Sequence, residues 1–380
     1  MRVITIFIPL KKNKFFCISM LGKNYGDNIK PLSDYICSKE GAEIIWAFND
    51  VFYDVVNCEY EKVKMYSWKY YYHIMTSKYI LNNQFLYDAI FVKRRKQIFL
   101  QTWHGTALKR LGYSIPCKQK ISLKKIYSRY NIFCIRKAYN ILISNSTFMT
   151  RVYREAYHYY KPIYEIGTPR NDIFFKDKPE IIQQIKNIFN IPDENRILLY
   201  APTYRVNKTM EYYNLDFKQL KDSLKQKTGC QYSIIVRLHP NMANQSKDFD
   251  NYFKGYVDAT LYPDMQELLY ATDILVTDYS ASMFDYMYLK RPIVLYVPDK
   301  NIYDRGFYWD MDNLPFIIIN NNEEISSKIS NFNMDKYKND IENFLSKIES
   351  CENGRATENC YQLLLQYGKD KKNKNDLGKN

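Results

Sequence analysis

The 380-residue chain is longer than one average domain, and its 46% hydrophobic content suffices for a substantial core, which excludes a disordered protein. Its formal charge of +14 predicts an anionic partner, such as a nucleic acid, a phosphorylated small molecule or an acidic membrane surface. The eight cysteines lack metal-ligand spacing, which argues against a zinc site or a disulfide framework and indicates reduced thiols in a cytosolic compartment.

The first half of the chain alternates short apolar runs with longer helical patterns, which is typical of parallel α/β sheets. The N-terminal apolar run is broken by Lys11, Lys12 and Lys14, so it predicts strand, turn and strand rather than a signal peptide. Strands are also expected at residues 15–21, 42–48, 97–103 and 139–146. Helices are expected at residues 28–40, 67–83 and 147–157, the last one after the capping cluster 144–146.

The second half repeats this pattern. Strands are expected at residues 196–202, 232–240, 273–280 and 292–298, and helices at 216–227, 264–272 and 280–291. The fold class is therefore α/β, with two Rossmann-like domains facing a cleft. The Gly- and Pro-containing segment 166–185 marks the boundary. We expect domains at residues 1–165 and 166–368, followed by a polar, disordered tail at 369–380.

Polar and basic residues end or directly follow several of the expected strands, at the edge where open α/β sheets bind ligands. The residues are His104, Thr203, Arg205, Arg237, His239, Asp278, Ser280 and Ser282. Two arginines after neighbouring strands favour a phosphate site, because the guanidinium fork matches phosphate oxygens. Two alternatives stay open: Asp278 or Ser280 is only a helix N-cap, and His239 is only a hydrogen-bonded structural histidine.

Motifs of several other enzyme classes are missing from the sequence. It has no GxxxxGK[ST] loop, GxGxxG turn, HExxH helix or GxSxG elbow, which argues against P-loop NTPases, dinucleotide oxidoreductases, zinc proteases and typical α/β hydrolases. No window approaches about 18 uninterrupted apolar residues, so no segment is expected to span a bilayer.

The motifs together resemble the CDP-glycerol glycerophosphotransferase family, whose enzymes prime or extend wall teichoic acid and related capsules. The resemblance runs in order from residue 22 to 310, through GKNYGDNIKPLSDYI, QTWHGTALKRLG, SNSTFMTRVYREAY, IGTPRND, ILLYAPTYR, VRLHPNM, ELLYATDILVTDYSASMFDYMYLKRPIVLY and DRGFYWD. It implies a GT-B architecture of two Rossmann-like domains, in which the C-terminal domain holds the nucleotide donor.

The resemblance also implies residue roles. His104 falls on the catalytic WHGT histidine and His239 on the histidine of the R-x-HP stretch. The expected substrate-binding residues are Thr203, Arg205, Arg237, Asp278, Ser280 and Ser282. Many members carry a second serine directly after TDYS, whereas this chain has Ala281 there, which puts the register of the helix-start contact in doubt.

The reaction implied by the resemblance is attack of an acceptor hydroxyl on the β-phosphorus of a CDP-alditol, with release of CMP. We assign His104 as the general base, because a histidine with a pKa near neutrality can take the hydroxyl proton. No carboxylate cluster indicates a metal site, so no cofactor is predicted and a Mg²⁺ requirement stays open. The acceptor is lipid-linked or a polyol-phosphate polymer, and the absence of a long N-terminal module favours addition of one or a few units.

Residues 118–137 carry seven Lys/Arg and no Asp/Glu, and their apolar residues recur at helical spacing. One interpretation is an interfacial helix on an anionic membrane, with Lys124, Lys125 and Arg129 facing the lipid, which places the protein peripherally on the cytoplasmic side of the cell membrane. The other is a packed helix with a solvated basic face. Rival functions are a GT-B glycosyltransferase using a nucleotide sugar and a nucleic-acid-binding protein. The second fits poorly, because no nucleic-acid-binding motif is present, and we expect no nucleic-acid partner.

Overall fold

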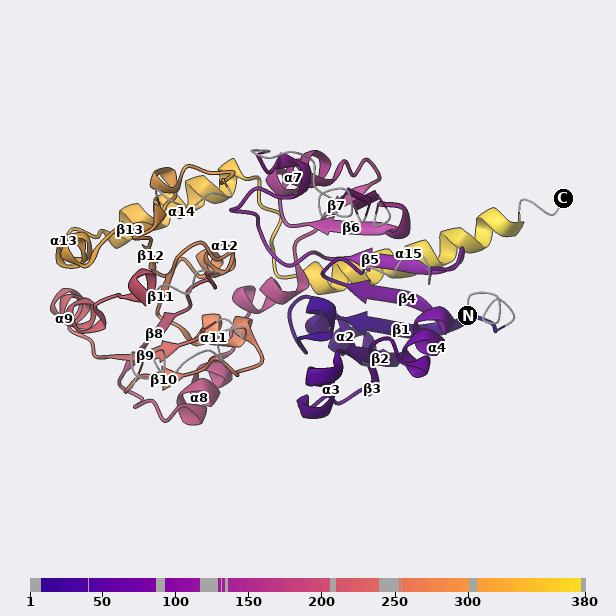
Figure 1. The fold of residues 1–380 in the computed structure, drawn as a ribbon, viewed down its shortest axis with the longest axis horizontal. Coiled ribbons are helices and arrows are strands. Elements are labelled where there is room, and N and C mark those ends of the chain that lie inside the picture. Colours follow the sequence, from indigo (N-terminus) through magenta and orange to yellow (C-terminus); the bar gives the residue numbers. More distant parts are fainter. Residues whose placement is uncertain are drawn as a thin grey trace. The chain divides into compact units, whose positions relative to one another are not determined.

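The structure is a computed structural model that describes residues 8–39, 41–86, 93–116, 129–130, 132–133, 136–205, 210–238, 253, 255–300 and 306–376. The chain forms two compact units (Figure 1). Unit 1 comprises Met1–His104, Leu111–Phe175 and Glu349–Asn380, and unit 2 comprises Gly105–Arg110 and Lys176–Ile348. Each unit is built on one parallel sheet covered by helices, as the alternating pattern predicted.

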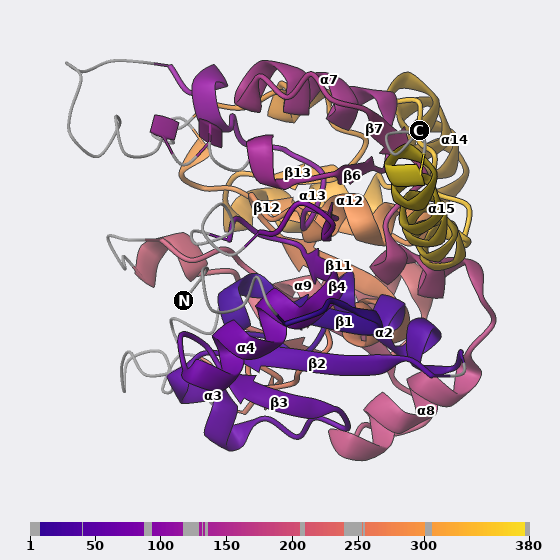
Figure 2. The ribbon, with the colours of Figure 1, turned by 90° about the vertical axis from the view of Figure 1, so that its right-hand side faces the viewer.

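The sheet of unit 1 has the strand order β3-β2-β1-β4-β5-β6-β7, and its pairings are parallel. The strands are β1 (Lys11–Ile18), β2 (Glu43–Phe48), β3 (Glu61–Lys64), β4 (Ser77–Asn82), β5 (Ile98–Gln101), β6 (Ile141–Ser144) and β7 (Ile163–Glu165). The helices are α2 (Ile29–Cys37), α3 (Asp50–Val55), α4 (Trp68–Thr76), α7 (Thr147–Tyr157) and α15 (Ala356–Asp376), with short 3₁₀ turns η1 (Met20–Gly22), η2 (Gly112–Ser114) and η3 (Pro169–Phe175). Figure 2 shows β1, β2 and β3 side by side, with α3 next to β3.

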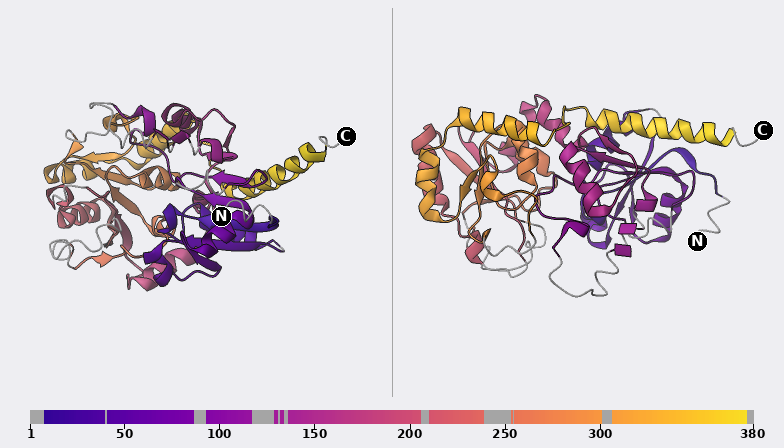
Figure 3. Two further views of the ribbon diagram at one scale, coloured as in Figure 1. Left: turned by 45° about the vertical axis from the view of Figure 1, so that its right-hand side comes forward. Right: turned by 90° about the horizontal axis from the view of Figure 1, so that it is seen from above.

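The core of unit 1 lies between the sheet and helices α2 and α15. Apolar residues of β1 and β2, such as Phe15 and Trp46, pack with Leu32 of α2 and with Cys360 and Leu364 of α15. In Figure 3, α15 is the long yellow helix that runs along unit 1. The buried side chains of β1 and β2 thus pack against a helix from the far end of the sequence.

Helix α4 ends earlier than the sequence pattern suggested. We predicted one helix over residues 67–83, but it ends at Thr76, and Ser77–Asn82 forms β4, which pairs with both β1 and β5. The hydroxyls of Thr76 and Ser77 donate to the last helical carbonyls, those of Tyr72 and His73, and help end the helix. No Gly or Pro marks this junction, so the pattern alone did not reveal it.

Unit 2 has the strand order β10-β9-β8-β11-β12-β13, again with parallel pairings. The strands are β8 (Arg196–Tyr200), β9 (Tyr232–Val236), β10 (Val257–Asp258), β11 (Ile274–Thr277), β12 (Ile293–Tyr296) and β13 (Ile317–Ile319). The helices are α8 (Pro179–Ile188), α9 (Phe217–Thr228), α11 (Met265–Ala271), α12 (Ser282–Tyr286), α13 (Ile325–Ser330) and α14 (Met334–Lys347), with 3₁₀ turns η4 (Met210–Tyr213), η6 (Met287–Leu289), η8 (Met311–Asn313) and η9 (Asn322–Glu324). Helices α9 and α13 pack on one face of this sheet through Phe217, Leu220, Ile325 and Ile329.

The observed division differs from the predicted boundary at residues 165/166. Unit 1 extends to Phe175, and the chain returns to it at Glu349. Asp172 explains this return, because its carboxylate accepts hydrogen bonds from the backbone N–H groups of Ala356 and Thr357 at the start of α15. Helix α15 continues to Asp376, so it includes most of the segment 369–380 that was predicted to be a disordered tail.

Candidate active site

Both sheets are doubly wound, so each has a point where the strand order reverses and where ligands bind in open α/β folds. In unit 1 this point lies between β1 and β4, and in unit 2 between β8 and β11. Ser19 follows β1 and Asn83 follows β4, and the Asn83 amide donates to the Ser19 hydroxyl at 3.2 Å. The site of unit 1 is built around this pair of strand ends.

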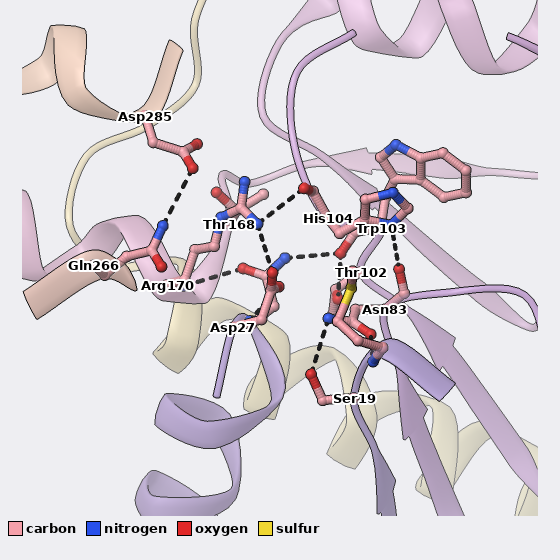
Figure 4. A network of polar contacts seen from close by, with 12 residues as sticks. Ser19, Asp27, Asn83, Thr102, Trp103, His104, Thr168, Arg170, Gln266 and Asp285 are labelled. Carbon is pink, nitrogen blue, oxygen red and sulfur yellow. Dashed lines mark hydrogen bonds and ion pairs between the residues drawn. The ribbon is translucent and has the colours of Figure 1, made fainter. Parts of the chain in front are cut away.

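His104 lies at the end of β5, where the sequence predicted it, and its ring contacts the Asn83 carbonyl. The Nδ1 atom is 2.9 Å from that carbonyl oxygen (Figure 4). Because a carbonyl oxygen can only accept, Nδ1 carries the proton and Nε2 is the basic atom of the neutral ring. Among the described residues Nε2 has no hydrogen-bond partner. The ring is therefore in the tautomer that a general base requires.

Trp103 holds the backbone on the N-terminal side of His104. Its φ is +59°, a left-handed conformation that is rare for a large residue and is found where surrounding contacts enforce it. The indole is buried against Phe85 and Tyr157 and stacks on the His104 ring with centroids 4.4 Å apart. The Trp103 carbonyl accepts from the Asn28 amide at 2.9 Å.

Two residues that sequence reasoning missed, Asp27 and Arg170, form an ion pair beside His104. Arg170 Nη1 lies 2.7 Å from Asp27 Oδ2 and donates to the His104 carbonyl at 2.9 Å. The Arg170 backbone N–H donates to Asn28 Oδ1 at 3.1 Å. Both residues lie in stretches that carried the family resemblance, GKNYGDNIK and IGTPRND, and that was the only signal for them in the sequence.

The surroundings of His104 keep its imidazole neutral. Burial lowers the pKa of His104 below its ordinary value, and the hydrogen bond to the Asn83 carbonyl and the Asp27 charge oppose this shift only in part. For Asp27, burial alone would raise the pKa, but Arg170, the Asn28 backbone N–H and the Asn83 side chain hold it below the usual range. At neutral pH the site therefore combines a neutral histidine with a charged ion pair.

In unit 2, Arg205 is buried in a charged cluster at the carboxyl ends of β8, β11 and β12. Its Nε donates to Asp299 Oδ2 at 2.7 Å, and its Nη1 donates to Asp278 Oδ2 at 2.7 Å. Asp278 also accepts from the Thr203 backbone N–H at 2.9 Å. Burial alone would lower the pKa of Arg205, but the two carboxylates raise it. A direct contact between Arg205 and donor phosphates stays a prediction, and two carboxylates already engage its guanidinium here.

Ser280 and Ser282 lie together where β11 leads into α12. The Ser282 hydroxyl donates to Ser280 Oγ at 2.9 Å, and the Ser282 backbone N–H donates to the same oxygen at 3.3 Å. Ala281, the residue by which this chain departs from the family pattern, is the N-cap of α12 and has no side-chain capping bond. The structure thus brings Thr203, Arg205, Asp278, Ser280 and Ser282 to one edge of the sheet.

Arg237 follows β9 at this edge and differs from Arg205 in its contacts. Its Nη1 atom is buried and has no hydrogen-bond partner in the part of the chain that the structure describes. Burial lowers the pKa of Arg237 to about 10, and the charge of Asp264 offsets this only in part. A buried guanidinium nitrogen without a hydrogen-bond partner among the described residues is suited to an anion, which fits the predicted phosphate contact. His239, two residues further on, lies outside the described residues.

The predicted membrane-facing residues are described only in part. Lys124 and Lys125 lie outside the described residues, whereas Arg129 is exposed and its guanidinium lies over the Tyr113 ring, 5.4 Å from the centroid. None of the helices in the described ranges combines the length and apolar character needed to cross a membrane.

One group of potential metal ligands occurs among the described residues, formed by Glu43, Glu61 and His73. It lies at the amino ends of β2 and β3, away from the carboxyl ends that carry His104. Lys11 and Lys14 already contact Glu43, at 3.1 and 3.0 Å. This group is therefore not part of the candidate site.

The geometry of the site can be compared with known proteins. The profile of the CDP-glycerol:poly(glycerophosphate) glycerophosphotransferase family matches residues 1–366. The chain belongs to this family. The resemblance that the sequence motifs indicated is therefore confirmed.

Within the family, the chain is similar to teichoic acid enzymes of different lengths. It is 28% identical to the teichoic acid poly(glycerol phosphate) polymerase of Bacillus spizizenii, over 94% of this chain and 93% of that protein. It is 29% identical to the teichoic acid glycerol-phosphate transferase of Staphylococcus aureus, over 93% of each. It is 31% identical to the polymerase of Staphylococcus epidermidis over 90% of this chain, but it spans only 49% of that relative.

A solved structure of this family shares the fold. The structure of the wall teichoic acid polymerase TagF has a TM-score of 0.81 and 29% identity, covering 95% of this chain and 90% of that one. The α/β fold class predicted from the sequence, with its GT-B architecture, is thus confirmed.

Proposed function

We propose that this chain transfers glycerol phosphate, or a related alditol phosphate, from CDP-glycerol to a hydroxyl of a lipid-linked or polymer acceptor. The reaction belongs to the synthesis of teichoic acid or a similar capsule. The acceptor oxygen forms a bond to the β-phosphorus, the bond from that phosphorus to the CMP oxygen breaks, and CMP leaves. The hydroxyl proton passes to His104 Nε2. The observation that carries the proposal is the neutral, Nδ1-protonated His104 in a chain matched to this family over residues 1–366.

In this proposal the two units have separate tasks. His104 of unit 1 acts on the acceptor hydroxyl, and the carboxyl edge of the unit 2 sheet binds the donor. Arg237 is the cation best suited to a donor phosphate, because its buried Nη1 lacks a partner among the described residues. Ser280 and Ser282 supply hydroxyls next to the start of α12, and His239 is assigned a phosphate contact by its place in VRLHPNM. Preorganised donors of this kind stabilise charge that develops on phosphoryl oxygens.

We further propose that the protein works on the cytoplasmic face of the membrane as a peripheral protein. The support is the basic segment 118–137 and its described neighbours, where Arg129 is exposed and the aromatic side chains of Tyr130 and Phe133 reach solvent. Basic groups beside exposed aromatics suit an anionic lipid surface.

A donor screen tests the proposed function. CMP release is measured with CDP-glycerol and CDP-ribitol in the presence of a lipid-linked glycerol phosphate acceptor. UDP and GDP release from sugar nucleotides is measured in parallel. We expect CMP release that depends on the acceptor. Nucleoside diphosphate release from sugar nucleotides, without CMP release, would instead assign the chain to the glycosyltransferases of GT-B architecture.

A further inference from the structure

Two residues distant in sequence hold the backbone on both sides of the His104 peptide. Asn28, at the start of α2, donates its side-chain amide to the carbonyl of Trp103 at 2.9 Å. Arg170, in η3, donates to the carbonyl of His104 at 2.9 Å. These two residues are also bonded to each other, through the Arg170 backbone N–H and Asn28 Oδ1. Figure 4 shows Asp27, Arg170 and His104 as parts of one polar network.

From this arrangement we propose that Asp27 and Arg170 form a positioning pair for His104. Arg170 fixes the His104 backbone, Asp27 holds Arg170, and the two opposite charges balance beside the imidazole ring. The inference rests on the proposed function only in naming His104 as the base.

Backbone strain in the same place supports a constraint of this kind. Asp27 has φ +58° and Trp103 has φ +59°, both left-handed conformations that non-glycine residues seldom adopt. Each is held by hydrogen bonds: the Asp27 carboxylate accepts from the Asn28 backbone N–H at 2.6 Å, and the Trp103 backbone N–H donates to Gln101 Oε1 at 2.9 Å. Strained conformations persist when surrounding contacts over-determine them, and they cluster at functional sites.

The segment that carries Arg170 is itself fixed from its other side. Glu352 accepts from the Thr168 backbone N–H at 3.0 Å and from the Asn171 side-chain amide at 2.9 Å. Gly167 has φ +83°, and a Cβ built there would lie 2.6 Å from the Glu352 carboxylate. The stretch IGTPRND thus connects the return of the chain at Glu349 to the backbone of His104, which explains why Arg170 can act as a fixed support.

The charges around His104 make the pair more than a structural contact. The described titratable groups that face this network include Asp27 from the α2 start, Arg170 from η3, and Tyr153 from α7, whose pKa is raised by burial so that it stays neutral. Asp27 favours the protonated imidazole and Arg170 disfavours it. Removing one partner therefore leaves the charge of the other uncompensated, and the two removals shift the pKa of His104 in opposite directions.

The direct test is an NMR titration of the histidine ring carbons, which works in the absence of any substrate. The chain has four histidines, and the His104 signal is assigned by its loss in His104→Gln. We expect Arg170→Gln to raise the His104 pKa and Asp27→Asn to lower it, because each variant removes one of the two opposing charges. The double variant should return it towards the wild-type value, and Lys30→Gln, which removes a charge from α2 without contacting His104, should leave it unchanged.

Turnover measurements complete the test. In Asp27→Asn and Arg170→Gln we expect kcat to fall by about 10²-fold, because misplacing a catalytic group typically costs a factor of this size. The KM for CDP-glycerol should change little. The acid limb of the pH profile should move up in Arg170→Gln and down in Asp27→Asn. Arg170→Lys keeps the positive charge but loses the planar guanidinium group. The acid limb of its pH profile should therefore stay in place while kcat falls.

The outcomes separate this inference from the proposed function. The positioning pair would be overturned if both single variants moved the His104 pKa in the same direction, or if the folded single variants kept an unchanged kcat. If a single variant fails to fold, the double variant and Arg170→Lys decide, since neither leaves an unpaired buried charge. If the two single variants shift the His104 pKa in opposite directions but the wild-type protein releases no CMP, the pair is upheld and the proposed function is rejected.

Discussion

Arg205 and Asp299 meet through two hydrogen bonds, Nε to Oδ2 at 2.7 Å and Nη2 to Oδ1 at 3.0 Å. Both side chains are buried, and the Asp299 carboxylate also accepts from the Tyr279 hydroxyl at 2.9 Å. The pair ties the loop after β8 to the loop after β12. Its main measurable contribution should therefore be to stability.

The first prediction follows from this pair. Arg205→Leu leaves the carboxylates of Asp278 and Asp299 buried without their cation, so it should destabilise the protein by about 3–5 kcal/mol. Chemical denaturation measures this change. The control is Lys290→Gln, which breaks an exposed ion pair with Glu342 and should change stability far less than Arg205→Leu. If the Arg205→Leu protein folds with normal stability but binds the donor weakly, the prediction is contradicted and Arg205 is a phosphate ligand instead.

Acid should destabilise the protein through the same cluster. Burial alone would raise the pKa of Asp299, but the Arg205 guanidinium and the Tyr279 hydroxyl hold it below its ordinary value. A carboxyl group with a lowered folded-state pKa stabilises above the unfolded value of about 3.9, and the effect is lost as the pH falls through the folded pKa. The free energy of unfolding should therefore fall steeply below about pH 4. This slope should be shallower in Asp299→Asn, and an identical slope would contradict the prediction.

Arg237 should behave in the opposite way to Arg205. Its buried Nη1 lacks a partner among the described residues, so Arg237→Met should leave stability unchanged or higher, while CDP-glycerol affinity falls by about tenfold or more. Isothermal titration with CDP-glycerol and thermal unfolding measure the two effects. Lower stability with unchanged affinity would make Arg237 a structural residue.

Membrane binding is predicted to depend on the basic segment. Reversing the charge at Lys124, Lys125 and Arg129 should weaken sedimentation with anionic vesicles, and salt should weaken wild-type binding. A matched triple reversal at the exposed residues Lys218, Lys225 and Lys336 should bind like the wild type. Equal binding of both triple variants would favour a packed helix with a solvated basic face.

Much of the fold could be predicted because buried parallel strands form apolar runs in the sequence. The runs that became β2, β5, β8 and β11 were recognised as strands. The missed strands include β10, two residues at a sheet edge, and β4, which follows a helix without a Gly or Pro. The return of α15 to unit 1 could not be predicted, because the bonds that fix it join Asp172 to residues 184 and 185 positions later.

The candidate site could be predicted as a set of strand-end residues but not as a network. His104 was predicted to lie in the site because it occupies a turn between a predicted strand and a basic stretch. The contact between Asp27 and Arg170 joins residues 143 positions apart, and neither position has a chemical signal of its own. Arg205 was assigned to phosphate because its guanidinium fork matches phosphate oxygens, and that assignment stays a prediction. Its contact with Asp299, 94 positions away, could not be inferred from spacing.

The last prediction concerns His104 itself. Because Nδ1 faces the Asn83 carbonyl, Nε2 is the atom that accepts the acceptor proton. Loss of a general base typically costs about 10²–10⁴-fold, so His104→Ala should lower single-turnover CMP release by that factor. CDP-glycerol affinity should change little, because Arg237 and the serines of unit 2 are assigned to the donor. His158→Asn, at the left-handed end of α7, is the matched control and should keep full turnover.

The pH profile of the wild-type enzyme gives this prediction a second readout. Burial lowers the pKa of His104 below its ordinary value of about 6.5, and only the neutral ring can take a proton. The rate should therefore be independent of pH near neutrality and should decline only at pH values below about 6.5. His104→Ala should lose this decline along with its rate. A folded His104→Ala protein with normal turnover, or with the decline intact, would reduce His104 to a structural residue of the turn after β5.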